Sequence, residues 1–311
     1  MKHTSVLLKE TVDALNVRED GIYVDGTLGR GGHAKLLLSY LKDGHLYGID
    51  KDREALRESE ANLCDYSGKY TLIHGDFRDM KNLLGGYGVE RVDGVMLDLG
   101  VSSPQFDDPE RGFSYRYDAR LDMRMDRTQE KDAYQVVNTY SREDLTRILR
   151  EYGEERFAPR IAENIVRARK EAPVETTLQL VEIIRSSLPA KVLNRKGHPA
   201  KQTFQALRIE VNDELGALEE GLREACALLK EGGRCAVITF HSLEDRMVKN
   251  VFRELTEPPY IDPKLPVKEK DLPKAEYRLP ARKPVTAGEG ELEENHRAHS
   301  AKLRVIERAE G

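Results

Sequence analysis

The chain has 311 residues, of which 34% are charged and 39% hydrophobic, and its formal net charge at pH 7 is −5. This charge argues against indiscriminate nucleic-acid binding but allows a local basic face. No apolar run approaches the roughly 20 residues of a membrane helix, and the N-terminus lacks the apolar core of a signal peptide. The cysteines, Cys64, Cys226 and Cys235, are too few and too scattered for a disulfide framework or a zinc site. We therefore expect a cytoplasmic protein without a metal, built as one domain with an insertion or as two domains.

Residues 22–50 hold the pattern around which the core is expected to form. A lead-in helix over residues 3–15 is expected to pack beside an apolar strand over 22–24. The strand ends at Asp25, and a glycine-rich turn, a helix and a second strand ending at Asp50 follow. The glycines of the turn are Gly26, Gly29, Gly31 and Gly32. Glycines allow close approach of the backbone to a ligand, and an acid after the second strand can bind both hydroxyls of a ribose. These features predict a cofactor that contains adenosine.

Asp25 indicates which cofactor this is. Residues 29–34 satisfy G-x-G-x-x-A, and Asp50 follows about 20 residues later, as a dinucleotide site requires. A carboxylate at Asp25, however, would repel a pyrophosphate and would hold the ammonium of a methionine moiety. This favours S-adenosylmethionine over NAD, and a glycine turn without a ligand is a third interpretation. His33, inside the turn, is expected to shape the cofactor pocket rather than to transfer protons.

Further apolar strands follow at residues 70–74, 92–99 and 233–240, and an alternating strand at 300–308 could lie antiparallel at or near the sheet edge. Strands that alternate with helices predict a doubly wound, mostly parallel α/β sheet that binds ligands at the carboxyl ends of its strands. Four acids are expected on this rim: Asp25, Asp50, Asp76 and Asp98. Phe77, next to Asp76, could stack on an adenine or could lie in the core of a turn.

More than 130 residues separate the fourth strand from the fifth, far more than a usual crossover needs. We therefore predict a helical substrate-recognition domain over residues 106–209, inserted between core segments 1–105 and 210–311. Helices are expected to begin at Ser141 and to cover 154–171 and 177–188. One long helix over about 202–230 is expected to join the insertion rigidly to the core. Residues 258–284 hold seven of the 13 prolines and predict an irregular loop.

The turn over residues 98–105 is expected to face the cofactor. An exocyclic amine is a poor nucleophile because its lone pair is delocalised into the ring. Acceptors for its N–H groups could draw the nitrogen toward sp³ geometry, so catalysis would rest on positioning, worth roughly 7–11 kcal/mol. The candidate acceptors are Asp98, the Leu99 or Val101 carbonyl and Ser102. Gln105 could contact cofactor or substrate, and Ser103 and Pro104 are assigned to the substrate side. The alternative is a turn that only ends the strand and buries Asp98.

Two basic segments indicate an RNA contact. Residues 111–127 interleave arginines, beginning with Arg111, with aromatic residues, as an unpaired RNA strand requires, although three aspartates make a self-paired loop a close alternative. Residues 185–209 carry cations and no acid: Arg185, Lys191, Arg195, Lys196, Lys201 and Arg208. We prefer an RNA-backbone contact over a solvated basic face for this run. His241, after the fifth strand, could contact the substrate or cap the following helix.

Several motifs together resemble the bacterial MraW (RsmH) family of ribosomal RNA small-subunit methyltransferases. They begin at His3 (HTSVLL), Asp25 (DGTLGRGGH), Asp98 (DLGVSSPQ), Gly112 (GFS), Phe204 (FQALRI) and Phe240 (FHSLED). The resemblance spans essentially the whole chain and implies a class I methyltransferase core with a helical insertion.

It further implies methyl transfer from S-adenosylmethionine to N4 of a cytidine in the decoding region of 16S rRNA. By motif match, the family's cofactor contacts fall on Gly31, Gly32, His33, Asp50, Phe77, Asp98 and Gln105. Without the resemblance, the residues indicate only a methyltransferase acting on an amine. An NAD-dependent oxidoreductase and a non-enzymatic RNA-binding assembly factor are the alternatives.

Overall fold

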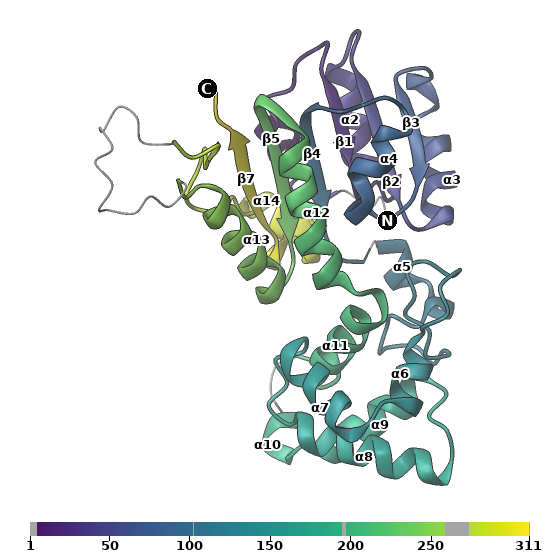
Figure 1. The fold of residues 1–311 in the computed structure, drawn as a ribbon. Helices are drawn as coiled ribbons and strands as arrows, with labels where there is room; N and C mark the ends of the chain where they lie inside the picture. Colours follow the sequence, from purple (N-terminus) through teal and green to yellow (C-terminus); the bar gives the residue numbers. More distant parts are fainter. Residues whose placement is uncertain (1–4, 102, 195–196, 259–273, 311) are drawn as a thin grey trace, which may run out of the picture. The chain divides into compact units, whose positions relative to one another are not determined.

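The computed structural model describes residues 5–101, 103–194, 197–258 and 274–310 (Figure 1). The chain forms two compact units, a core unit of Met1–Gly100 with Leu215–Gly311 and an inserted unit of Val101–Glu214. The divisions between the units lie five residues from each boundary expected from the sequence. None of the helices in the described ranges combines the length and apolar character needed to cross a membrane.

The core unit contains a seven-stranded sheet in the order β3-β2-β1-β4-β5-β7-β6 (Figure 1). The strands are β1 (Ile22–Asp25), β2 (His45–Asp50), β3 (Tyr70–His74), β4 (Val92–Asp98), β5 (Leu229–Thr239), β6 (Tyr277–Arg278) and β7 (Lys302–Arg308). Strands β1 to β5 are parallel, whereas β7 is antiparallel to both β5 and β6. The prediction of a doubly wound, mostly parallel sheet is confirmed, as is an antiparallel last strand near the edge. The strand order reverses between β1 and β4, where such sheets bind ligands.

Alternate side chains of the central strands pack into two apolar clusters. Val24, Val95 and Val237 lie in one cluster, with residues of α4 (Met80–Gly85), α12 (Glu214–Leu228) and α13 (Ser242–Leu255). Met96 and Ala236 lie in the other, with residues of α1 (Leu8–Ala14) and α2 (Gly32–Tyr40). Helices thus cover both faces of the sheet. Because side chains on both faces are buried, these strands form nearly continuous apolar runs in the sequence.

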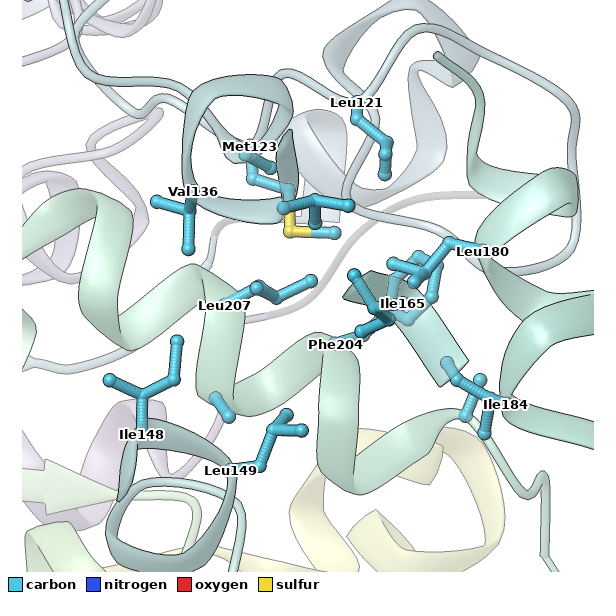
Figure 2. Close-up of a cluster of buried hydrophobic side chains, with 14 of the residues drawn as sticks. Leu121, Met123, Val136, Ile148, Leu149, Ile165, Leu180, Ile184, Phe204 and Leu207 are labelled. Carbon is cyan, nitrogen blue, oxygen red and sulfur yellow. The ribbon is translucent and has the colours of Figure 1, made fainter. Parts of the chain in front are cut away.

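The inserted unit has its own helical core, as predicted. Its main helices are α6 (Ala133–Thr139), α7 (Arg142–Glu151), α8 (Ala158–Glu171), α9 (Thr177–Ser187) and α11 (Lys201–Asn212). Ser141 caps α7 by accepting a hydrogen bond from the Asp144 N–H at 3.0 Å. Figure 2 shows the apolar side chains that meet between these helices, including the buried Ile148, Ile165 and Leu207.

The prediction of one long helix over about 202–230 is wrong. Helix α11 ends at Asn212, and Asp213 adopts a left-handed conformation with φ of 48° before α12 begins at Glu214. A left-handed residue ends a helix because its backbone cannot continue the right-handed hydrogen-bonding pattern. The break lies at the division between the two units, so no continuous helix joins them.

Several elements were not anticipated. They include α4, α6, α5 (Ser103–Asp107), α10 (Ala190–Leu193), α14 (Glu289–Glu294), β6 and the first residues of β5. Most are short, and β5 begins four residues before the predicted Gly233, with a register shift against β4. The proline-rich segment predicted as an irregular loop falls mostly outside the described residues.

Candidate functional site

Three acids lie at the carboxyl ends of neighbouring strands of the core unit: Asp25 on β1, Asp50 on β2 and Asp98 on β4. Backbone bonds hold these ends in register. The Gly26 N–H donates to the Met96 carbonyl at 3.0 Å, and the Asp98 N–H donates to Thr27 Oγ1 at 2.6 Å. Three of the four acids expected on the rim therefore lie at strand ends, and hydrogen bonds fix the end of β1 against that of β4.

Asp50 supports the glycine turn. Its Oδ2 accepts the Gly29 N–H and its Oδ1 accepts the Asp52 N–H, each at 2.8 Å. Gly29 and Gly31 have φ values of 53° and 75°, a left-handed conformation that glycine adopts without strain. Burial raises the pKa of Asp50 to about 6, despite these two hydrogen bonds. Each carboxylate oxygen keeps a further lone pair, so Asp50 can also accept from ribose hydroxyls.

Asp25 is the most deeply buried acid of the rim, with 3% of its surface exposed. Its Oδ1 accepts the Thr27 N–H at 3.1 Å. Burial, and then the charges of Asp98 and Asp50, raise the pKa of Asp25 to about 8. A buried acid beside two others favours a cation as its ligand, which fits the ammonium of a methionine moiety and not a pyrophosphate.

An acid and an aromatic residue follow the third strand, which ends at His74. Asp76 caps a short helical turn by accepting the Arg78 N–H at 3.1 Å, and Lys51 Nζ lies 3.7 Å from its Oδ2. The half-buried ring of Phe77 packs closely against Gly221 of α12, where a Cβ atom would lie 2.4 Å from Phe77 Cδ2. This contact fixes the ring while leaving part of it exposed, so its packing is compatible with stacking on an adenine.

Asp98 meets His33 at the start of α2. His33 Nδ1 lies 3.9 Å from Asp98 Oδ2, and His33 Nε2 lies 3.0 Å from the Val6 carbonyl oxygen. Burial raises the pKa of Asp98, with opposing effects from the charges of His33 and Arg297 and a further rise from Glu244. Asp98 Oδ1 has no hydrogen-bond partner among the described residues, so it can serve as an acceptor.

The remaining residues of the turn belong to the inserted unit. Gln105 lies in α5 and is 8% exposed. Ser103 and Pro104 begin α5, but their side chains, like the whole of Ser102, lie outside the described residues. Arg195 and Lys196 are also outside them, whereas Lys201 is exposed at the start of α11.

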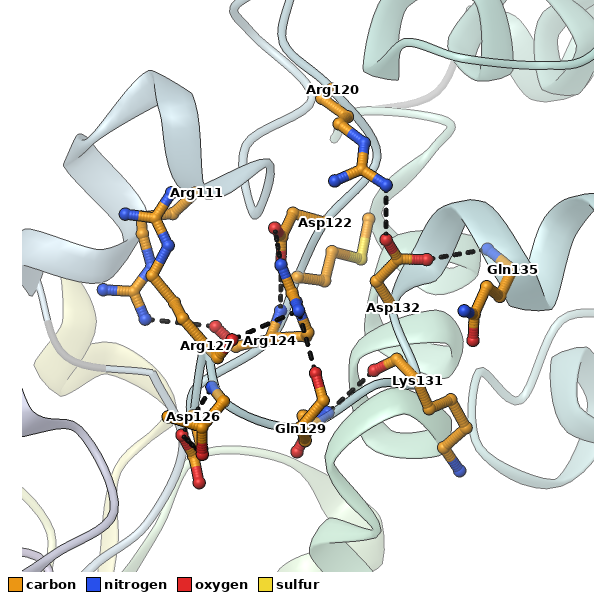
Figure 3. Close-up of polar contacts among 12 residues, drawn as sticks. Arg111, Arg120, Asp122, Arg124, Asp126, Arg127, Gln129, Lys131, Asp132 and Gln135 are labelled. Atoms are coloured by element: carbon orange, nitrogen blue, oxygen red, sulfur yellow. Dashed lines mark hydrogen bonds and ion pairs between the residues drawn. The ribbon is translucent and has the colours of Figure 1, made fainter.

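The arginine-rich loop is largely self-paired, as Figure 3 shows. Arg111 is 3% exposed, and its guanidinium donates to the carbonyls of Arg124 and Met125 at 3.0 Å. Arg124 pairs with Asp122 at 2.8 Å, and Arg120 pairs with Asp132 at 2.7 Å. The structure therefore gives Arg111 an interior, structural role in place of the predicted substrate contact.

His241 is also a structural residue. Its imidazole accepts the Glu244 N–H, and the Glu244 side chain accepts the His241 N–H, which forms a capping box at the start of α13. The structure shows the helix cap, one of the two sequence-based interpretations of His241, and the substrate contact stays a prediction. Within the described ranges, no group of three or more histidine, cysteine, aspartate or glutamate residues is placed to hold a metal ion.

Sequence reasoning missed Arg297 and Thr27. The Arg297 guanidinium lies 5.2 Å from the centre of the Phe240 ring, and its charge acts on Asp98. Thr27 orients the end of β4 through its hydroxyl. Threonine in a glycine turn and arginine before a strand are both common, so nothing in the sequence indicated Thr27 or Arg297 as a candidate site residue.

The strand order, the glycine turn and the acidic rim define a Rossmann-like class I methyltransferase. The MraW methylase family matches residues 1–309. Ribosomal RNA small subunit methyltransferase H of Limosilactobacillus fermentum is 53% identical over 308 residues, 98% of each chain. The proteins of the same name from Exiguobacterium sibiricum and Oenococcus oeni are each 50% identical. The alignments cover 99% and 98% of this chain, respectively, and 98% of each relative.

The chain belongs to the MraW methylase family. This confirms the predicted reaction class and S-adenosylmethionine as the cofactor in preference to NAD. It also confirms the family resemblance drawn from the motifs.

Proposed function

We propose that this protein transfers a methyl group from S-adenosylmethionine to the N4 amine of a cytidine in the decoding region of 16S rRNA. It would act in the cytoplasm, on rRNA within the small ribosomal subunit. Family membership and relatives named as ribosomal RNA small subunit methyltransferase H support the RNA substrate. The observation that carries the chemistry is Asp98 Oδ1 at the end of β4, an acceptor atom that has no hydrogen-bond partner among the described residues.

The core unit supplies most of the proposed cofactor contacts. Asp50 would bind the ribose hydroxyls, Asp25 the methionine ammonium and Phe77 the adenine. The glycine turn with Gly29, Gly31, Gly32 and His33 would line the methionine side. Gln105 is proposed as a further contact, on the family motif alone.

S-adenosylmethionine supplies an electrophilic methyl group, and the protein has to position the amine. Asp98 Oδ1 would accept an N–H of the amine and direct the nitrogen lone pair away from the ring. Ser102 stays a second candidate acceptor, with Ser103 and Pro104 on the substrate side, although their side chains lie outside the described residues. Positioning of this kind can supply roughly 7–11 kcal/mol of the barrier reduction.

The inserted unit is proposed to contact the RNA. Arg116, Arg185 and Lys201 are exposed on it. Tyr115 stacks on His198 with ring centres 4.1 Å apart, and the charges of Arg185 and Arg116 act on that imidazole. Cations near an aromatic stack suit an RNA strand, whose phosphates and bases they can bind. Arg195 and Lys196 belong to the same proposal on sequence grounds.

Nucleoside mass spectrometry tests the reaction. Small subunits and free 16S rRNA from a strain lacking the gene are incubated with the protein and S-adenosylmethionine. N4-methylcytidine is expected with the wild-type protein and with Asp13→Asn, an exposed acid on α1, but is strongly reduced with Asp98→Asn. A different methylated nucleoside would refute the cytidine assignment. Full activity of Asp98→Asn would refute the role of its carboxylate.

RNA affinity tests the inserted unit. Lys201→Glu should weaken binding and lower the slope of log affinity against log salt by about one, as expected for a lost phosphate contact. Lys249→Glu, the same change at an exposed position of α13, should leave the slope unchanged. Equal effects of the two substitutions would mean that Lys201 contributes only general charge.

A further inference from the structure

The geometry fixes where the proton of His33 lies. The Val6 carbonyl can only accept a hydrogen bond, so His33 Nε2, 3.0 Å away, must carry a proton and donate it. In the neutral imidazole, Nδ1 then presents a lone pair. That lone pair lies 3.9 Å from Asp98 Oδ2, and His33 is 6% exposed. Two acceptors thus face each other in a buried place, an arrangement that favours binding of one proton between them.

Both partners are held in this orientation. Val6 is 2% exposed, and the next residue, Leu7, donates its N–H to Glu291 Oε1 at 2.8 Å, which anchors the segment that selects the tautomer. On the other side, the Asp98 backbone is held by Thr27 Oγ1. An imidazole whose one nitrogen is fixed by a carbonyl offers the other nitrogen in a defined direction.

We propose that His33 is a second proton acceptor in the active site, which takes up from Asp98 the proton released by the methylated amine. This inference rests on the function proposed above and deepens it. As the N–CH₃ bond forms, the CH₃–S bond breaks and its electron pair stays on sulfur. The nitrogen, now cationic, gives a proton to the Asp98 carboxylate.

Rotation of the Asp98 carboxyl group about Cβ–Cγ then presents this proton to His33 Nδ1. The product is an imidazolium that faces the Asp98 carboxylate, and the proton passes to water when the products leave. Catalytic hydrogen bonds often tighten only when substrate is bound, and a proton on the Asp98 carboxyl group would turn the 3.9 Å separation between the two acceptors into such a bond. The transfer restores Asp98 as an acceptor for the next amine.

The other charged groups near this pair act on the ionisation of Asp98 in opposite directions. Arg297 favours the carboxylate form of Asp98, whereas Glu244 disfavours it. The charge of Asp98 in turn disfavours ionisation of Asp25. Since burial also disfavours the carboxylate, Asp98 would tend to keep a proton that had no further acceptor. His33 supplies that acceptor.

His33→Gln tests the proposal through kinetics. The glutamine amide can still donate to the Val6 carbonyl but has no nitrogen that titrates. At saturating S-adenosylmethionine and RNA, the multiple-turnover rate should fall by about 100-fold, the lower end for a positioned acid–base group, whereas the first turnover, in which Asp98 alone can take the proton, should keep most of its rate. The acidic limb of the rate profile should move to lower pH, because one proton-binding group of the pair is lost. An unchanged rate and an unchanged limb would overturn the proposal.

An NMR measurement tests the tautomer without any methyl transfer. In the full-length protein, the ring nitrogen chemical shifts of His33 should show the proton on Nε2 and the lone pair on Nδ1. The exposed His299 serves as the internal control. A His33 ring with its proton on Nδ1 would overturn the proposal. Failure of the proposed function would be seen separately, as wild-type protein that methylates no cytidine.

Discussion

Binding of the cofactor should release a proton from Asp25. Burial and the neighbouring acids raise the pKa of this carboxyl to about 8, so at pH 7 its protonated form exceeds the carboxylate by about ten to one. An ammonium group can pair only with the carboxylate, so binding at pH 7 should release about 0.9 proton. Ionising Asp25 at this pH costs about 1.4 kcal/mol of binding free energy.

The sign of the pH dependence follows directly. Affinity should rise almost tenfold per pH unit from pH 6 to about pH 7, reach a maximum near pH 8 and then fall, because the ligand's own α-amino group loses its proton near 7.7–8.0. Without ligand, the raised pKa has the opposite consequence for folding. The stability associated with protonated Asp25 is complete below the ordinary pKa of 3.8 and is lost as the pH rises through about 8. Asp25→Asn should therefore stabilise the ligand-free protein above pH 8.

Calorimetry measures the released proton. S-adenosylhomocysteine carries the same ammonium, and its binding enthalpy at pH 7 is compared in buffers of different ionisation enthalpy. The slope should be about 0.9 proton for the wild type and for the exposed control Asp13→Asn, and near zero for Asp25→Asn. Asp50, with a pKa of about 6, adds only about 0.1 proton at pH 7. A slope near zero in the wild type, or one unchanged in Asp25→Asn, would refute the pairing of Asp25 with the ammonium.

Three further substitutions test other contacts. Gly221→Ala places a Cβ 2.4 Å from Phe77 Cδ2 and should displace the ring, so the affinity for S-adenosylhomocysteine should fall several-fold. For the stability of the fold, the higher helix propensity of alanine, about 1 kcal/mol, partly offsets an overpacking cost of about 1–3 kcal/mol. An unchanged affinity would remove Phe77 from the cofactor site. Asn212→Ala leaves the Met125 N–H and the Met123 carbonyl without their partner, so the free energy of unfolding should fall by on the order of 3 kcal/mol in chemical denaturation. A loss below about 1 kcal/mol would show that water replaces the amide. Burial raises the pKa of Asp122, but hydrogen bonds from Arg124 outweigh burial, so the net pKa is lowered. The Asp122–Arg124 pair therefore stabilises the folded state fully above pH 3.8, and this contribution is lost as the pH falls through the lowered pKa. Asp122→Asn should lower thermal stability at pH 7 and flatten its decline in acid, and a decline as steep as the wild type's would contradict this.

The core was predictable from sequence because its first strands are short apolar runs, of which β1, β2 and β4 end in an acid. β3 and β4 lie within one residue of their expected bounds, and β1 and β2 each extend by one residue at one or both ends. In a parallel sheet, topology alone brings the strand ends to one edge. The meeting of Asp25, Asp50 and Asp98 therefore followed from their positions in the chain.

Features that depend on a single residue were not predictable. The apolar spacing runs from Val211 to Leu215 without interruption, and nothing in it shows that Asp213 turns left-handed between them. In the same way, an arginine-rich loop does not reveal that Arg111 lies in the interior, and a histidine after a strand does not reveal that His241 caps a helix. These outcomes depend on which polar groups need partners in the finished fold, and periodicity does not report that.

The position of β7 has a consequence for synthesis on the ribosome. β7 is the last strand in the chain order, yet it lies between β5 and β6 in the sheet. Until β7 has been translated, β5 has an unpaired edge, and β6 pairs only with β7 among the described strands. Roughly 70 residues separate the end of β5 from that of β7, a stretch that takes roughly 4 to 14 seconds to synthesise at about 5–20 residues per second. A nascent chain that stalls in this interval would expose an apolar strand edge to other chains, so chaperone demand should peak just before Lys302 is added.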